Sequence, residues 1–191
     1  MGTLTDFGDG AVLLPLSVVI LTWLLWDNSR RIVGWWVIAV GLCIAATASL
    51  KIYLYACPLA SDLISPSGHS SLSVLIYGAI AVVIAAQQRG WLRAAIFAAG
   101  AGLIVAIAAS RFWLHAHSKR EIAIGIVIGF VSLALFAANY VGSRTEGRRL
   151  RPFILSVIVV AAIFHGQELH AEAILHAISR HLHIRGIACA G

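Results

Sequence analysis

Charged residues are scarce in this chain. Only 12% of its 191 residues are charged, whereas 60% are hydrophobic. Soluble domains carry charge on roughly 25% of their residues. One soluble core cannot bury this much apolar surface at this length, so the composition excludes an ordinary soluble domain and indicates that lipid surrounds most of the chain.

Two further features are sparse. No lysine or arginine precedes the first apolar run, so we expect no cleaved secretory signal, which begins with a positive segment. Cysteine occurs three times. Cys43 lies within an apolar run and is expected in the core. Cys57 and Cys189 are both predicted on the outer side, where an oxidising compartment would permit a disulfide between them.

Six apolar runs approach the length of about 20 residues that a membrane-spanning helix needs. They cover approximately residues 11–26, 32–55, 67–87, 92–110, 121–141 and 152–169, and the first and last are marginal in length. No stretch remains for a separate soluble domain. The sequence therefore predicts an all-α integral membrane protein with six transmembrane helices, forming a single domain over residues 1–191.

The basic residues fall in alternate connections between these runs, which the positive-inside rule assigns to the cytoplasmic face. They are Arg30, Arg31, Arg89, Arg93, Arg144, Arg148, Arg149 and Arg151. Both termini and the connections 56–66 and 111–120 then face outward, toward the periplasm of a bacterial cytoplasmic membrane. The net charge of +6 follows these turns, so we expect no nucleic-acid partner.

A first polar cluster, residues 65–70 with the sequence SPSGHS, opens the third apolar run. Ser65 followed by Pro66 is typical of a helix start, with a capping hydroxyl and then a residue that needs no N–H. The amides of a first helical turn form an anion site, and Gly68 would let an anion approach closely. The alternative is a capped helix that carries His69 on its surface.

A second polar cluster, residues 110–121 with the sequence SRFWLHAHSKRE, lies between the fourth and fifth runs. Ser118 and Glu121 have the spacing of a capping box. His117 and Glu121 are four residues apart, so they can share a helix face, where a carboxylate would fix the imidazole tautomer. Capping and orienting thus compete for the same carboxylate, and the sequence leaves both open.

Lys51 ends the second run. It is either an anchor whose ammonium reaches the membrane interface or a ligand for phosphate. Five of the eight histidines lie from His165 to the end of the chain. An apolar stripe through this tail favours an amphipathic helix on the outer membrane surface. A metal site is less favoured because no compact ligand motif is present, so we expect no metal and no cofactor.

Together these clusters resemble the type 2 phosphatidic acid phosphatase family, membrane relatives of nonspecific acid phosphatases and vanadium haloperoxidases. That family has the motifs K-x6-R-P, P-S-G-H and S-R-x5-H-x3-D. Residues 66–69 match the second motif in full. Ser110, Arg111 and His117 match the third, with Glu121 in place of the aspartate. The first is broken, because Lys51 is present and the arginine is missing.

The resemblance implies a phosphatase mechanism. His117 would be the nucleophile that takes the phosphoryl group, and Glu121 would orient it. His69 would protonate the leaving group and later activate water. Lys51, Ser67, the Gly68 amide and Arg111 would hold the phosphate oxygens. Neutral imidazoles suit these roles near pH 7, and cations with helix-end amides stabilise charge on the transferring group.

The expected substrate is a lipid phosphate or diphosphate at the outer membrane face: a polyprenyl diphosphate, phosphatidylglycerophosphate, phosphatidic acid or lipid A phosphate. Two alternatives remain open, a lipid-to-lipid phosphotransferase and a catalytically silent lipid-phosphate binder. A bis-histidine haem protein is disfavoured because the histidines cluster on the outer side. Lys119, Arg120 or His115 could compensate for the missing arginine.

Overall fold

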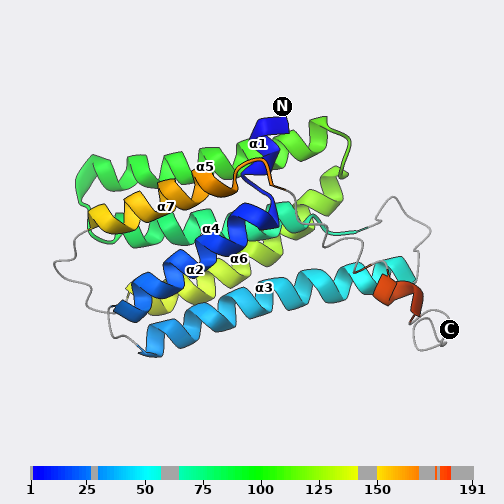
Figure 1. The fold of residues 1–191 in the computed structure, drawn as a ribbon, viewed down its shortest axis with the longest axis horizontal. Coiled ribbons are helices and arrows are strands. Elements are labelled where there is room, and N and C mark those ends of the chain that lie inside the picture. The colour runs from blue at the N-terminus through cyan, green and yellow to red at the C-terminus, as the bar shows by residue number, and fades with distance from the viewer. Residues whose placement is uncertain are drawn as a thin grey trace.

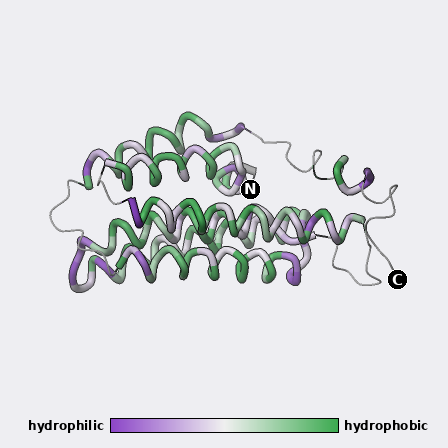
Figure 2. The backbone as a smooth tube through the Cα atoms, turned by 90° about the horizontal axis from the view of Figure 1, so that it is seen from below, coloured by the Kyte–Doolittle hydropathy of each residue, from purple (hydrophilic) through white to green (hydrophobic). Residues whose placement is uncertain are grey.

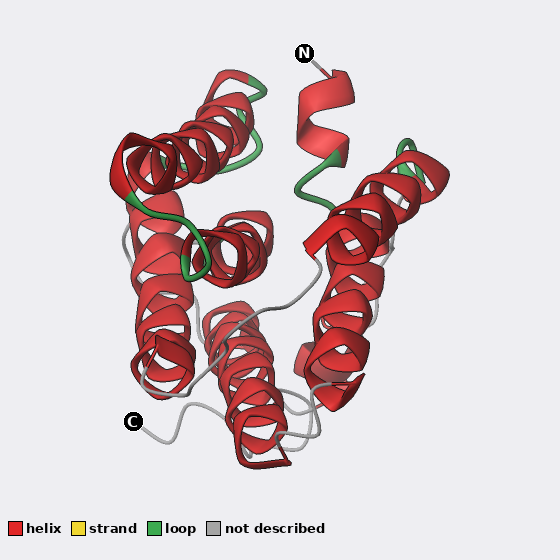
Figure 3. Ribbon diagram, turned by 90° about the vertical axis from the view of Figure 1, so that its left-hand side faces the viewer, coloured by secondary structure: helices red, strands yellow, loops and turns green. Residues whose placement is uncertain are grey.

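A computed structural model describes residues 2–26, 30–56, 65–141, 150–167, 175 and 177–181. Within these residues the chain is helical and has no strands (Figure 1, Figure 3). The helices are α1 (Gly2–Asp6), α2 (Gly10–Trp26), α3 (Arg30–Ala56), α4 (Gly68–Ala85), α5 (Gly90–Trp113), α6 (Lys119–Val141) and α7 (Leu150–Phe164). The predicted all-α class is confirmed.

Helix α4 forms the centre of the molecule. It contacts α2, α3, α5 and α6, and nearly all of its side chains are buried by them. The surrounding helices instead carry large apolar side chains on their outer surfaces, including Val18, Val37, Val105, Val127, Phe130 and Leu155. An apolar exterior around a packed centre is the arrangement expected for helices that face lipid.

Four helices, α3, α4, α5 and α6, are long and apolar enough to cross a membrane, while α2 and α7 are shorter apolar helices. The protein is therefore a multi-pass membrane protein. Figure 2 shows hydrophobic residues along the helices and hydrophilic residues concentrated near their ends. Six complete spans and outward-facing termini stay predictions.

Helix boundaries differ from the sequence prediction by a few residues in most cases. The run predicted over 152–169 forms a helix only over Leu150–Phe164, and α1 was not predicted. Of the tail, residues 165–167 are described and not helical, and residue 175 and residues 177–181 are described and helical. The rest of the predicted amphipathic tail and both Cys57 and Cys189 lie outside the described residues, whereas Cys43 is buried as predicted.

Two glycines allow α6 to approach α4 at backbone distance. A Cβ atom at Gly125 would lie 2.5 Å from the carbonyl oxygen of Ser67, and one at Gly129 would lie 2.3 Å from that of Ser71. Glycines four residues apart on one helix face are a common device for close contact in membranes. They place the start of α6, and with it Glu121, directly beside the start of α4.

The two polar clusters meet at one end of this bundle. The C-terminal ends of α3 and α5 and the N-terminal ends of α4 and α6 lie there together, at the right of Figure 1, and α1 lies near the same end. Alternating helix directions therefore bring sequence segments that are far apart into one site.

Candidate active site

Helix α4 begins at Gly68, with Ser67 as its N-cap. The Ser67 Oγ accepts hydrogen bonds from the Ser70 amide at 3.3 Å and from the Ser70 hydroxyl at 3.0 Å. The sequence prediction that Ser65 caps this helix is wrong by two residues. Because Ser67 has an extended backbone, it provides the capping geometry. The amides of the first turn, from Gly68 onward, still point out of the helix end.

Helix α5 ends in a Schellman motif. The Ala116 amide donates to the Arg111 carbonyl and the His115 amide to the Phe112 carbonyl, and His115 has a φ of 54°. Glycine usually occupies this left-handed position because it has no Cβ. The motif turns the chain sharply, so that His117, two residues later, is directed back into the protein.

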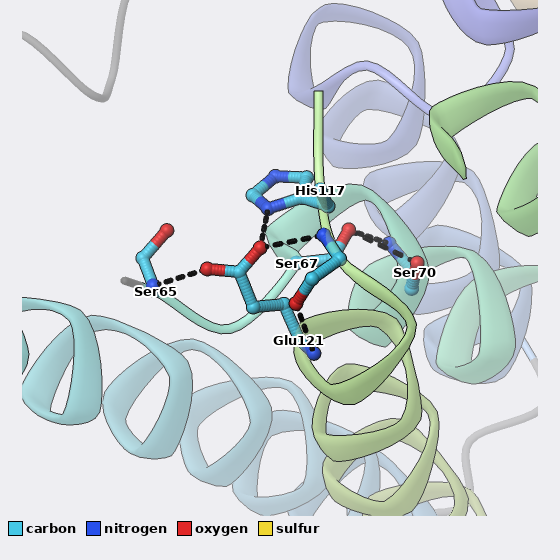
Figure 4. Close-up of polar contacts among 6 residues, drawn as sticks. Ser65, Ser67, Ser70, His117 and Glu121 are labelled. Atoms are coloured by element: carbon cyan, nitrogen blue, oxygen red, sulfur yellow. Dashed lines mark hydrogen bonds and ion pairs between the residues drawn. The ribbon is translucent and has the colours of Figure 1, made fainter. Parts of the chain in front are cut away.

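Glu121 joins both polar clusters through its carboxylate (Figure 4). Its Oε1 accepts a hydrogen bond from the Ser65 amide at 2.6 Å, and its Oε2 accepts one from the Ser118 amide at 2.8 Å. The same Oε2 lies 3.3 Å from Nδ1 of His117. Capping and contact with the histidine, which the sequence set in competition, are therefore made by one carboxylate at once.

His117 is almost fully buried, with its side chain 6% exposed. Burial lowers the pKa of its imidazole below the ordinary value of 6.5, and the positive charges of Lys51 and Arg111 lower it further. The Glu121 carboxylate opposes this shift but does not reverse it. The imidazole is therefore neutral near pH 7, with Nδ1 facing Glu121 and Nε2 on the other side of the ring.

Lys51 lies inside the protein and not at its surface. It is only 3% exposed, and its Cε would be 4.0 Å from a Cβ at Gly68. An anchor at the membrane interface would keep its ammonium in water, so burial argues against that interpretation. Lys51, Gly68 and His69 line one cavity of about 200 Å³.

This cavity has walls of two kinds. Its polar wall includes Lys51, His69 and Asp9, and its apolar wall comes from α2, α3 and α4 through Leu14, Ile44, Ala48 and Leu72. Leu14 and Ile44 are among the exposed apolar side chains. The cavity thus lies between charged groups at the end of the bundle and apolar groups on its side.

Asp9 is the residue that the sequence analysis missed. Its Oδ2 lies 3.4 Å from Nε2 of His69. Asp9 precedes α2 and is separated from His69 by the whole of α3, and no motif includes it. No sequence signal singled it out beyond its acidic character in a chain with only eight acidic residues.

Not every predicted residue reaches the cavity. His117, Glu121, Arg111 and Ser67 are absent from its lining, and Ser67 is fully buried within its cap. Lys51 links the two parts of the site, because it lines the cavity and its charge acts on His117. The helix ends that carry the predicted residues thus lie together, but the sequence did not indicate that the buried His117–Glu121 pair is absent from the cavity lining.

The three residues proposed to replace the missing arginine are exposed: His115, Lys119 and Arg120. Lys119 lies over the ring of Phe112, with Nζ 5.3 Å from the ring centroid. Lys119 and Phe112 both line a larger, apolar cavity of about 680 Å³ between α4, α5 and α6. The residues predicted for catalysis or phosphate binding do not line that cavity, whereas Lys51, Gly68 and His69 line the smaller one, so we assign phosphate binding to the smaller cavity.

The chemical groups assembled here suit phosphoryl transfer. A neutral, oriented imidazole is a nucleophile, a second imidazole can move a proton, and cations with helix-end amides can bind an anion. The residues that provide these groups are His117 with Glu121, His69, Lys51 and Gly68.

Comparisons with known proteins agree with this chemistry. Residues 54–145 match the PAP2 superfamily model. A protein of Klebsiella pneumoniae described as an uncharacterized 22.5 kDa protein in the cps region is 30% identical over 134 residues, which is 68% of this chain and 64% of the relative. The match therefore spans just under two thirds of that relative's length. No solved structure gives a significant match.

The family match begins after Lys51 and includes the second and third motifs, from Pro66 to Glu121. Members of this superfamily are phosphatases, so the match supports a phosphatase-type function. The match of residues 54–145 to the PAP2 superfamily is consistent with the resemblance to the type 2 phosphatidic acid phosphatases.

Proposed function

We propose that this protein is a membrane lipid phosphatase that hydrolyses a lipid phosphate or diphosphate through a phosphohistidine intermediate at the periplasmic face. The observation that carries the proposal is the buried His117–Glu121 pair beside the positive charges of Lys51 and Arg111. A carboxylate on one ring nitrogen and cations nearby are what a neutral nucleophilic imidazole needs for attack on a phosphate.

The first step uses Nε2 of His117. With a proton on Nδ1 directed to Glu121, the lone pair is on Nε2. Nε2 attacks phosphorus, the bond from phosphorus to the leaving oxygen breaks, and His69 gives that oxygen a proton. The Lys51 ammonium, the Arg111 guanidinium and the Gly68 amide hold the remaining oxygens.

The second step releases phosphate. Neutral His69 takes a proton from water, the resulting oxygen attacks phosphorus, and the bond from phosphorus to Nε2 breaks. His117 is then free again and His69 is protonated for the next turnover. The scheme balances with water as its only co-reactant.

The shape of the small cavity supports an amphiphilic substrate. Phosphate would bind where Lys51 joins the polar wall to the His117–Glu121 pair, while the adjoining apolar side chains on α2 and α3 would contact the hydrocarbon part. A polyprenyl diphosphate, phosphatidic acid, phosphatidylglycerophosphate or a lipid A phosphate each has both parts.

The test is phosphate release by purified protein from a panel of these lipids, with EDTA present, comparing the wild type with His117→Ala. We expect release by the wild type that survives EDTA, a loss of at least about 10³-fold in the variant, and lipid binding that persists. Binding without release by the wild type would overturn the proposal and identify a lipid-phosphate binder. Transfer of phosphate to a second lipid would identify a phosphotransferase.

A further inference from the structure

Asp9 presents one carboxylate oxygen to His69. Oδ2 lies 3.4 Å from Nε2 of the imidazole. The side chain of Asp9 is 12% exposed and that of His69 is 20% exposed. Both residues line the small cavity together with Lys51 and Gly68. The contact therefore occurs on the wall where the phosphate group is proposed to bind.

The other carboxylate oxygen is fixed by the start of α2. Oδ1 of Asp9 accepts a hydrogen bond from the Ala11 amide at 2.8 Å. The carbonyl of Asp9 accepts from the amides of Val12 and Leu13, and its amide donates to the Asp6 carbonyl. With the backbone and Oδ1 held in this way, Oδ2 has a defined position.

The segment that carries Asp9, residues 5–9, packs against buried residues of α4 and α5. Thr5 Oγ1 lies 2.7 Å from the Ser110 hydroxyl oxygen, and the Tyr77 hydroxyl donates to the Phe7 carbonyl at 2.7 Å. A Cβ at Gly8 would lie 2.6 Å from Cγ2 of Ile107, so glycine is needed for this close approach. The turn before α2 is thereby fixed against α4 and α5.

An ordinary capping role for Asp9 accounts for only part of this geometry. Capping requires one side-chain oxygen, and serine or asparagine would provide it equally well. It gives no reason for the second oxygen to face a histidine at the site. Carboxylates that contact the far nitrogen of a functional histidine commonly fix its tautomer and ring orientation.

We propose that Asp9 is a positioning residue that holds His69 for proton transfer. With Nε2–H directed to Asp9, Nδ1 is the nitrogen that exchanges a proton with the leaving oxygen and then with water. The site would thus contain two carboxylate–imidazole pairs, Glu121 with the nucleophile and Asp9 with the acid–base group. This inference rests on the proposed function, in which His69 acts as the acid and base.

Leaving-group dependence provides the test. An alkyl alkoxide needs a proton as it departs, whereas an aryl oxide departs readily without one. Octyl phosphate and 4-octylphenyl phosphate would be compared with the wild type, Asp9→Asn, Asp9→Ser and His69→Gln. Asn and Ser both retain a capping oxygen for Ala11, and Asp6→Asn provides a control in the same segment.

We expect Asp9→Asn and Asp9→Ser to lose about 10- to 100-fold in kcat/KM, which reports the first step, on the alkyl ester and less than about 3-fold on the aryl ester. Asp6→Asn should hydrolyse both like the wild type. Adding Asp9→Asn to His69→Gln should cause little further loss, because the two residues act through one group. If one Asp9 variant fails to fold, the other carries the comparison.

Two results are decisive against the inference. Asp9 variants that hydrolyse both esters like the wild type, or that lose kcat/KM equally on both, would leave Asp9 with a capping role only. If the wild type hydrolyses neither these esters nor the lipid panel, the proposed function fails instead, and the two failures are therefore distinct.

Discussion

A single side chain at this site can make several contacts at once, as Glu121 does. Its carboxylate joins the Ser65 amide, the Ser118 amide and the imidazole of His117. The family motif has aspartate at this position, which is one methylene shorter. A shorter side chain on the same backbone cannot reach all three partners, so the longer acid fits the connection between α5 and α6 in this chain.

Restoring the family residue should therefore harm this protein. We expect Glu121→Asp to lower the stability by about 1–3 kcal/mol, because a charged acceptor is withdrawn from buried amides, and to reduce turnover. Thermal unfolding in detergent and phosphate release would measure both effects. Glu121→Gln, which keeps the length but not the charge, is the matched comparison. An aspartate variant as stable and active as the wild type would contradict this account.

The charge of Lys51 should control the titration of His117. Its removal in Lys51→Met should raise the pKa of His117 toward 6.5, because a neighbouring cation no longer disfavours the imidazolium. The acid limb of kcat/KM, which requires the neutral ring, then moves to higher pH. Glu121→Gln should move it to lower pH. In a variant that loses activity, titration of the His117 ring proton by NMR measures the same shift in the pKa.

The same pKa has a consequence for stability. A histidine whose folded pKa lies below its unfolded value binds fewer protons in the folded state. Its contribution to stability is complete above about pH 6.5, its ordinary pKa, and declines as the pH falls below it. An unchanged pKa of His117 in Lys51→Met would show that Lys51 does not contribute to the shift and that burial and Arg111 produce it.

At the scale of elements, the contact between α4 and α6 positions the groups of the candidate active site. Gly125 and Gly129 lie on the helix face that also carries Glu121. The backbone of α6 therefore approaches the first turns of α4, where Ser67 and Ser71 lie. Any side chain added at this contact separates the two polar clusters.

Gly129→Ala tests this contact. Its methyl group would lie 2.3 Å from the Ser71 carbonyl oxygen and 2.8 Å from Cβ of Val74, both of which belong to a packed helix. We expect a loss of about 1–3 kcal/mol from overpacking, seen as a lower Tm in detergent, together with lower activity. Gly102→Ala on α5, where nothing lies within 4 Å, is the control. Equal effects at both positions would refute the close contact.

The sequence predicted these elements unevenly. Apolar length was sufficient for the long helices because burial in lipid depends on composition over about 20 residues. The N-cap was misplaced because Ser65 and Ser67 are both capping residues, and only the backbone decides between them. Asp9 was beyond sequence reasoning, since its contact with His69 depends on how α1 and the turn after it pack against α5 and α4.

At the scale of the molecule, the site lies at one end of the bundle. The charged residues around His115 and those around Arg89 lie at opposite ends of α5. The positive-inside rule assigns the Arg89 end to the cytoplasm. The orientation of the protein in the membrane therefore determines whether the cavity lies at the cytoplasmic or at the opposite leaflet.

Single cysteines would test the orientation. In a background with all three native cysteines replaced by serine, His115→Cys and Arg89→Cys would each carry one exposed thiol. With a membrane-impermeant maleimide on intact cells, we expect position 115 to be labelled, and position 89 only after permeabilisation. The reverse pattern would place the site on the cytoplasmic face.

The serines of the central helix bear on how the protein is made. Ser70, Ser71 and Ser73 are buried against neighbouring helices, and α4 has the lowest mean hydropathy of the four long helices. Ribosomes deliver α4 before α5 and α6, which are two of its partners. Alone in lipid, its hydroxyl groups would lack the helices that now cover them. We therefore expect membrane integration of α4 to depend on segments synthesised after it, and the end of the bundle that carries the candidate site to form only when that insertion is complete.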